Sequence, residues 1–217
     1  MNSTEFIQWK IAAILLLSGG IFFWFGAFYP PYKQWITSDL KEYLTIISTH
    51  PLNWYIIHSA FTIGVILSIF GIQQYQDLLY SAGSNRILTG FILTAYLTGS
   101  IFWLLNIAFR LTVTMWAAKS LSHSGSIYDS FGTWMDWTNL IFAFYMVLAY
   151  FAIGCLGVVL RDIIWMPAWV SWFCIIFGFF GVIAYILRIP LWAPPLMVHL
   201  PLMIIGIATL IRLPGLA

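Results

Sequence analysis

Two histidines, His58 and His199, stand inside long apolar stretches of the chain. Imidazole is a ligand for haem iron, copper and zinc, and an ionisable residue at membrane depth is often functional. His58 lies five residues into the stretch 53–72, and His199 lies four residues into the stretch 195–211. At 1.5 Å per helical residue, both rings would lie about 6–8 Å below the same membrane face. This matched depth predicts one b-type haem held between the two rings.

A third apolar stretch adds polar residues on one helical face. Trp103, Asn106 and Arg110 follow one another at spacings of three and four residues, which places them on the same side of a helix. Arg110 is expected near the haem propionates, with Asn106 and Trp103 beside the cofactor. Trp103 and the aromatic residues around it also suit contact with a quinone.

Other uses of these residues stay open. His58, His199 and Asp136 could form a copper, iron or zinc site, since these metals accept imidazole and carboxylate ligands. Arg110, Asp136 and the histidines could instead line a path for protons or a substrate. Finally, each histidine could be a packed residue bonded to a carbonyl or hydroxyl, while Arg110 and Asp136 extend to the lipid headgroups.

The composition tells us what surrounds these residues. Of the 217 residues, 62% are hydrophobic and 7% are charged, against about 25% charged in soluble domains. Such a chain cannot cover itself with polar surface, so its main solvent is expected to be lipid. A net charge of +2 without a Lys/Arg cluster argues against a nucleic-acid partner. The motifs GxSxG, GxGxxG and HExxH and the Walker loop are absent from the sequence, which leaves soluble hydrolase, nucleotide and zincin chemistry without support.

The sequence predicts a single all-α transmembrane domain over residues 1–217. A helical span needs about 20 mostly apolar residues, and no stretch alternates as a β-barrel strand would. Six stretches qualify: 10–29, 53–72, 87–109, 137–160, 168–187 and 195–211. A short amphipathic helix over 37–48 is expected to lie on the membrane interface between the first two.

Six spans would place both termini on one side of the membrane, here called side A. Side B would hold the connections 30–52, 111–136 and 188–194. The Lys and Arg residues divide four against five between the sides, so the positive-inside rule leaves the orientation undecided. Interfacial aromatic belts are expected at Tyr29, Tyr32, Trp35, Trp54, Trp134, Trp137, Trp165, Trp169 and Trp192.

Small residues at helical spacing predict close helix packing. One such stripe contains Ser171, Cys174, Gly178 and Gly181, and another contains Ala60, Gly64 and Ser68.

The functional hypothesis is an electron-transfer membrane subunit that binds haem b through His58 and His199. It would exchange electrons with a quinone or a partner protein. One alternative is a non-catalytic accessory subunit, associated with other membrane subunits or with further copies of itself. The other is a small-molecule or ion transporter.

Overall fold

The computed structural model describes residues 3–30, 39–192 and 194–213, and every regular element in these ranges is helical. This confirms the predicted all-α class. The helices are α1 (Ser3–Phe28), α2 (Leu40–Thr49), α3 (Pro51–Ser81), α4 (Arg86–Phe109), α5 (Met115–Ser124), α6 (Phe131–Leu160), α7 (Ala168–Ile186) and α8 (Leu196–Arg212). A π-helical turn over Arg110–Thr114 joins α4 to α5, and a 3-10 turn over Pro190–Trp192 precedes α8.

Five helical segments are long and apolar enough to cross a membrane: Thr4–Phe28, Pro51–Ser81, Arg86–Ser124, Phe131–Leu160 and Ala168–Ile186. The apolar helix α8 is shorter, at 17 residues. These lengths make the chain a multi-pass membrane protein with five candidate spans and one shorter apolar helix.

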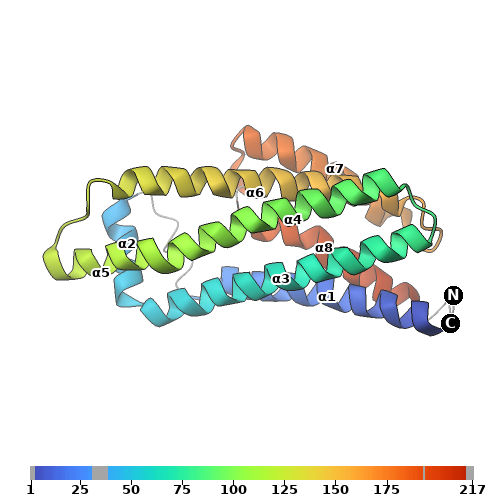
Figure 1. Cartoon of the computed structure of the whole chain (residues 1–217), viewed down its shortest axis with the longest axis horizontal. Helices are drawn as coiled ribbons and strands as arrows, with labels where there is room; N and C mark the ends of the chain where they lie inside the picture. The colour runs from blue at the N-terminus through green and yellow to red at the C-terminus, as the bar shows by residue number, and fades with distance from the viewer. Residues whose placement is uncertain (1–2, 31–38, 193, 214–217) are drawn as a thin grey trace.

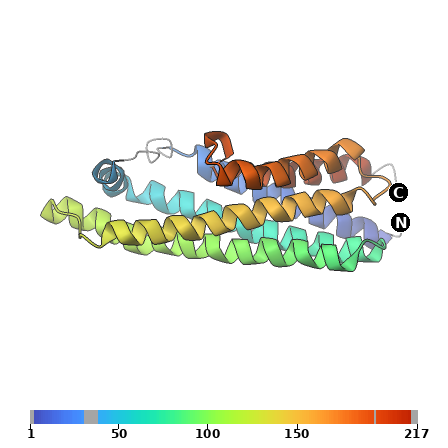
Figure 2. The same ribbon diagram turned by 90° about the horizontal axis from the view of Figure 1, so that it is seen from above.

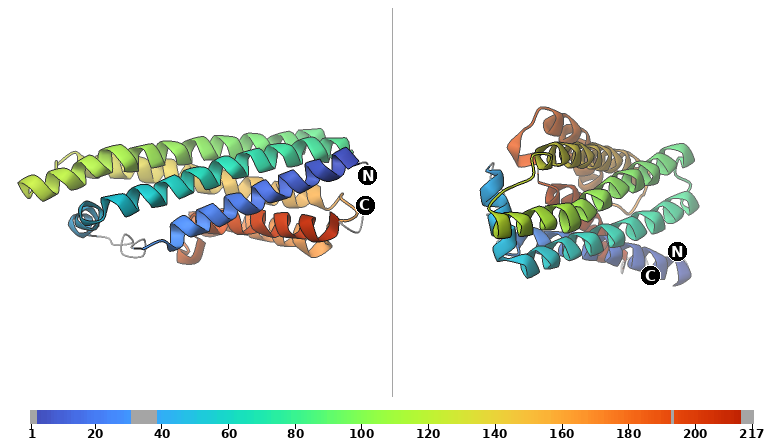
Figure 3. Two further views of the ribbon diagram at one scale, coloured as in Figure 1. Left: turned by 90° about the horizontal axis from the view of Figure 1, so that it is seen from below. Right: turned by 60° about the vertical axis from the view of Figure 1, so that its left-hand side comes forward.

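The long helices and α8 form a closed ring in which each packs against its neighbours. Around the ring the order is α1, α3, α4, α6, α7 and α8, and α8 packs back against α1. Figure 1 shows both chain ends at the same end of the bundle, as expected for side A. Helix α1 lies between α3 and α8, which is clear in the left view of Figure 3.

The short helix α2 lies across the side-B end of the bundle (Figure 1). It begins at Leu40, where the Asp39 carboxylate accepts hydrogen bonds from the backbone N–H groups of Lys41 and Glu42 at 2.8 and 3.2 Å. An N-cap of this kind satisfies N–H groups that have no partner within the helix. The first two residues of the predicted helix lie outside the described residues, as do Tyr32 and Trp35.

Two predicted loops are in fact largely helical. The expected side-B connection 111–136 shrinks to 125–130, because the chain continues through the π turn into α5, and α6 begins at Phe131. Helix α2 packs against α5, where Ala117, Ala118 and Leu121 are buried. At the other end, α3 continues to Ser81 instead of ending at residue 72.

Glycines allow two pairs of helices to approach closely. A Cβ atom built on Gly64 of α3 would lie 2.8 Å from the carbonyl oxygen of Gly19 in α1, and one on Gly178 of α7 would overlap the backbone of Gly154 in α6. Without a hydrophobic force between helices in lipid, such close backbone packing is what holds a bundle together. The predicted stripes containing Gly64 and Gly178 are therefore packing seams, and Gly19 and Gly154 are their partners.

We expect Gly178→Ala to destabilise the protein by about 1–3 kcal/mol, because the added methyl group has no space against α6. Thermal unfolding in detergent would measure the change. The matched control is Gly132→Ala, since a Cβ atom at Gly132 meets nothing within 4 Å. Equal effects of the two substitutions would contradict the close α6–α7 contact.

Candidate functional site

His199 lies much deeper in the bundle than the sequence predicts. Its Nδ1 atom is 3.3 Å from the hydroxyl of Ser68, and Ser68 is ten residues beyond His58 along α3. Ten helical residues correspond to about 15 Å. The predicted matched depth of His58 and His199 is therefore wrong. The reason is visible in Figures 1 and 2, where α8 begins part-way along the bundle and α3, α5 and α6 extend further.

Both ring nitrogens of His199 are engaged. The Ser68 hydroxyl donates to the Gly64 carbonyl at 2.9 Å, so its oxygen accepts from His199 Nδ1–H. The Nε2 atom then accepts from the Tyr145 hydroxyl at 3.1 Å. The ring of Phe23 stacks on the imidazole with 3.9 Å between centroids. His199 is thus a neutral ring inside a directed chain of hydrogen bonds.

Helix α4 adds three polar groups to this region. The Tyr96 hydroxyl, the Ser100 hydroxyl and the Trp103 indole N–H are all buried. Ser100 and Trp103 have no hydrogen-bond partner in the described part of the chain, and the Tyr96 hydroxyl has only the nearby Ser68 hydroxyl, beyond ordinary hydrogen-bond length. Their spacings of four and three residues place them on one helix face. Tyr96 lies beside Ser68, and both Tyr96 and Trp103 lie close to Tyr145, whose ring centroid is 5.0 Å from that of Trp103.

These residues from four helices form what we call the central cluster: Ser68, Tyr96, Ser100, Trp103, Tyr145 and His199. An unpaired polar group in an apolar interior costs about 1–3 kcal/mol. These groups on one helix face make the central cluster the candidate site. The buried residues of the described ranges include no Asp, Glu, Lys or Arg, so this place carries no formal charge.

His58 belongs to a separate layer nearer side B. Its Nδ1–H donates to the Trp54 carbonyl at 2.8 Å. The rings of Phe61 and Phe23 lie between the two histidines, with centroid distances of 6.0 Å from His58 to Phe61 and 4.6 Å from Phe61 to Phe23. In this arrangement aromatic side chains occupy the space that a haem between the two imidazoles would need, and His199 has no ring nitrogen left for iron.

Arg110 connects the π turn to α2. Its guanidinium donates to the Asn106 side-chain oxygen and to the Tyr43 hydroxyl, both at 2.8 Å. Its backbone carbonyl accepts from the Trp54 indole at 3.0 Å. Burial raises the pKa of the Tyr43 hydroxyl above its ordinary value, and the nearby Arg110 charge only partly offsets this. Tyr43 therefore meets Arg110 as a neutral hydroxyl.

Asn106 in turn donates to the carbonyl and hydroxyl oxygens of Thr138 in α6, at 2.9 and 3.1 Å. The side-B cluster is the connected set of Tyr43, Trp54, His58, Asn106, Arg110 and Thr138. Of the predicted haem residues, the structure thus joins His58, Asn106 and Arg110 in one network, and it places His199 and Trp103 in another.

A third polar pair lies towards side A. The Thr209 hydroxyl donates to the Ile205 carbonyl at 2.9 Å, and the Tyr75 hydroxyl bonds to Thr209. Thr209 is ten residues beyond His199 along α8, or about 15 Å. Buried polar groups therefore occur at three depths within the helix ring.

The alternative metal site is not formed. Over residues 3–30, 39–192 and 194–213, no three His, Cys, Asp or Glu side chains come together in a way that could hold a metal ion. Asp136 is exposed, because it lies on the outer side of α6, away from both buried histidines.

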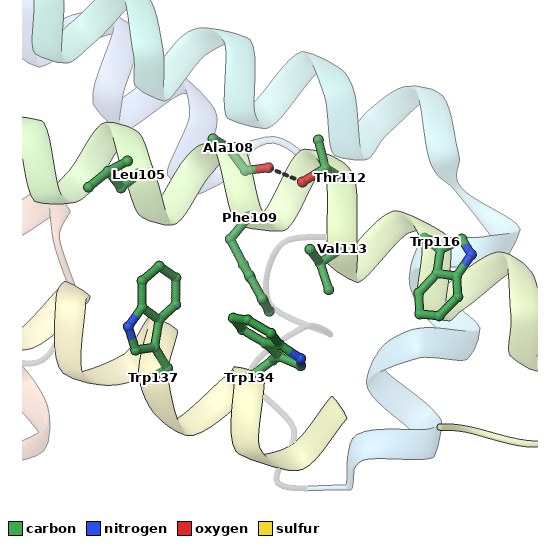
Figure 4. Close-up of a pocket in the computed structure, with 8 residues that line it drawn as sticks. All are labelled: Leu105, Ala108, Phe109, Thr112, Val113, Trp116, Trp134 and Trp137. Atoms are coloured by element: carbon green, nitrogen blue, oxygen red, sulfur yellow. Dashed lines mark hydrogen bonds between the residues drawn. The ribbon is translucent and has the colours of Figure 1, made fainter. Parts of the chain in front are cut away.

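An apolar groove of about 720 Å³ lies on the outer surface between α4–α5 and α6 (Figure 4). Phe109 and Val113 line one side, and Trp134 and Trp137 line the other. The two tryptophans are about half exposed. The groove offers a surface for lipid contact and no charged group for chemistry.

Comparisons of the chain with known protein families, with curated proteins and with solved structures find no match. The functional argument therefore depends on the geometry of the site.

Sequence reasoning missed most of the central cluster. Tyr96, Ser100 and Trp103 could have been recognised as a polar stripe by their helical spacing. Ser68 was interpreted only as a small packing residue, and Tyr145 as one of many aromatic residues. Nothing in the local sequence indicates that Tyr145 reaches His199.

We expect Tyr96→Phe to raise the free energy of unfolding of the ligand-free protein by about 1 kcal/mol, because it removes a buried hydroxyl that has no partner at ordinary hydrogen-bond length. Ser100→Ala should act in the same direction. Thermal unfolding of the purified protein would measure both changes.

The matched control is Tyr145→Phe, which removes the same atom from a hydroxyl that does have a partner. It should lower the free energy of unfolding by about 1 kcal/mol, since His199 Nε2 loses its donor. If Tyr96→Phe were as destabilising as Tyr145→Phe, the Tyr96 hydroxyl would be satisfied in the native protein.

Proposed function

We propose that this protein is a six-span membrane transporter or channel that passes a small neutral polar solute through the ring of helices. The sixth span in this proposal is α8, whose length of 17 apolar residues is at the lower limit for crossing a bilayer. Support for its crossing comes from its packing along α1 and from the common position of the two chain ends.

The proposal depends mainly on the buried polar groups of α4 that lack a hydrogen-bond partner in the central cluster. Buried donors without partners, such as Ser100 and Trp103, are costly in a bundle that serves only as a scaffold, whereas a solute that pairs with them gains hydrogen bonds. Further polar groups lie nearer side B and side A, and these are hydrogen-bonded within the protein. Aromatic rings between the layers would separate the central cluster from side B.

The sequence-derived haem role is a second hypothesis and stays a prediction. One observation favours it: His58 donates from Nδ1 to a backbone carbonyl, which is how ligating histidines are usually oriented, with Nε2 left for the metal. The engaged nitrogens of His199 favour the solute role instead. Quinone binding and an accessory role in a larger complex also remain predictions.

For the transport role, we expect proteoliposomes that contain the full chain to admit at least one of glycerol, urea or acetamide about tenfold faster than protein-free vesicles. Stopped-flow light scattering after an osmotic step would measure the rate. His199→Phe should abolish the increase, because it removes two hydrogen bonds from the central cluster. His199→Gln, which keeps a donor and an acceptor, should retain part of it. If none of the three solutes enters faster than in protein-free vesicles, the proposal fails.

An absorption spectrum of the purified protein would distinguish the haem role from the transport role. The transport proposal predicts no Soret band and no α-band after reduction. A Soret band that disappears in both His58→Ala and His199→Ala would instead establish the electron-transfer role.

A further inference from the structure

We infer that the central cluster selects neutral solutes that carry a hydrogen-bond-accepting oxygen, and that amide-type compounds match it best. This inference rests on the proposed transport function and defines its substrate class. It depends on which donors and acceptors remain unused in the cluster, and on the absence of charge there.

The unused groups on α4 need an acceptor. An indole N–H can only donate a hydrogen bond, so any partner of Trp103 must present a lone pair. The Ser100 hydroxyl has a proton available to donate, since it has no partner within the described chain, and the Tyr96 hydroxyl has only a long contact with Ser68. A carbonyl oxygen has two lone pairs and can accept from two of these three groups at once.

On the side of the cluster opposite α4, the Tyr145 hydroxyl oxygen offers a hydrogen-bond acceptor. Tyr145 uses its proton in the bond to His199 Nε2, because the other ring nitrogen already donates towards Ser68. The Tyr145 oxygen therefore keeps a free lone pair. A solute with a carbonyl on one side and an N–H on the other would bond both to the donors on α4 and to the Tyr145 oxygen. A primary amide has this pattern.

The cluster has no countercharge for an ion. Its six residues are neutral, and the buried residues of the described ranges include no acidic or basic side chain other than histidine. Transfer of an unpaired ion to such a site is far more costly than transfer of a neutral amide.

Arg110 adds a barrier to cations on the side-B approach. Its guanidinium donates to the neutral Asn106 and Tyr43 side chains and brings a positive charge to this layer. A fixed positive charge beside a path repels cations, as in other neutral-solute channels. The side-B cluster and the central cluster therefore favour the same class of solute.

Three probes of nearly equal shape test the inference: acetamide, acetate and acetamidinium, which carry zero, negative and positive charge. The experiment measures thermal stabilisation of the purified full chain across a millimolar titration of each, with sodium chloride added to equalise ionic strength. A ligand that binds the native state raises the unfolding temperature in proportion to its occupancy. We expect acetamide to raise it and the two ions to leave it unchanged.

Substitutions then identify the residues that bind acetamide. Trp103→Phe and Tyr96→Phe should each weaken acetamide binding about fivefold, as expected for the loss of one hydrogen bond. Trp137→Phe is the matched control, because Trp137 lies in the outer groove and not in the cluster; it should leave the binding unchanged.

The outcomes separate this inference from the function on which it rests. If acetate or acetamidinium stabilises the protein as much as acetamide, or if Trp103→Phe and Trp137→Phe behave alike, the inference is overturned. The transport function would still stand if glycerol or urea enters proteoliposomes rapidly. If no solute enters at all, the function fails and the inference fails with it.

Discussion

Inside a ring of helices this apolar, a buried polar group has to find its hydrogen-bond partner within the protein, because lipid supplies none. Most polar groups in the bundle meet this condition: Asn106 bonds to Thr138 and to Arg110, and His199 bonds to Ser68 and Tyr145. Ser84, Thr114 and Ser171 also lack a partner within the described residues, and the groups on α4 differ from them in lying together on one helix face. The bonds of Asn106 to Thr138 and of His199 to Ser68 and Tyr145 each join two helices of the bundle, whereas the bond between Asn106 and Arg110 lies within one helical stretch.

Close helix packing and the polar clusters depend on one another. Gly64 allows α1 to approach α3, and its carbonyl accepts the hydrogen bond from Ser68 that orients this side chain towards His199. Phe23 of α1, one helical turn beyond Gly19, packs against the other face of His199. The α1–α3 seam therefore positions the central cluster as well as holding two helices together. Small residues in this bundle have a role in the site that their size alone does not reveal.

The side-B end is built differently from the rest of the bundle. Here α2 lies across the ring and is joined to the π turn through Arg110 and Tyr43. The π turn shifts the helical register after Phe109, and π-helical turns occur frequently at functional sites. Arg110 is half-buried and is the charged residue of this layer. This layer is the entrance to the proposed path, and the neutral layer beneath it is where a solute would bind.

The sequence alone determined the class of this protein. Its apolar stretches predicted six spans, five of which are helices long enough to cross a membrane, and the small-residue stripes predicted two real packing seams, because these signals are local. The amphipathic pattern before residue 50 likewise predicted α2. The sequence did not reveal the depth of His199, which was counted from the start of its own helix on the assumption that all helices begin at one level. Only the tertiary structure decided that α8 begins part-way along the ring, that Phe23 and Phe61 separate the two histidines, and that Tyr145 and Ser68 are the partners of His199. These contacts join residues as far apart in the sequence as Phe23 and His199, and no periodic pattern in one helix indicates which residue of another helix it will face.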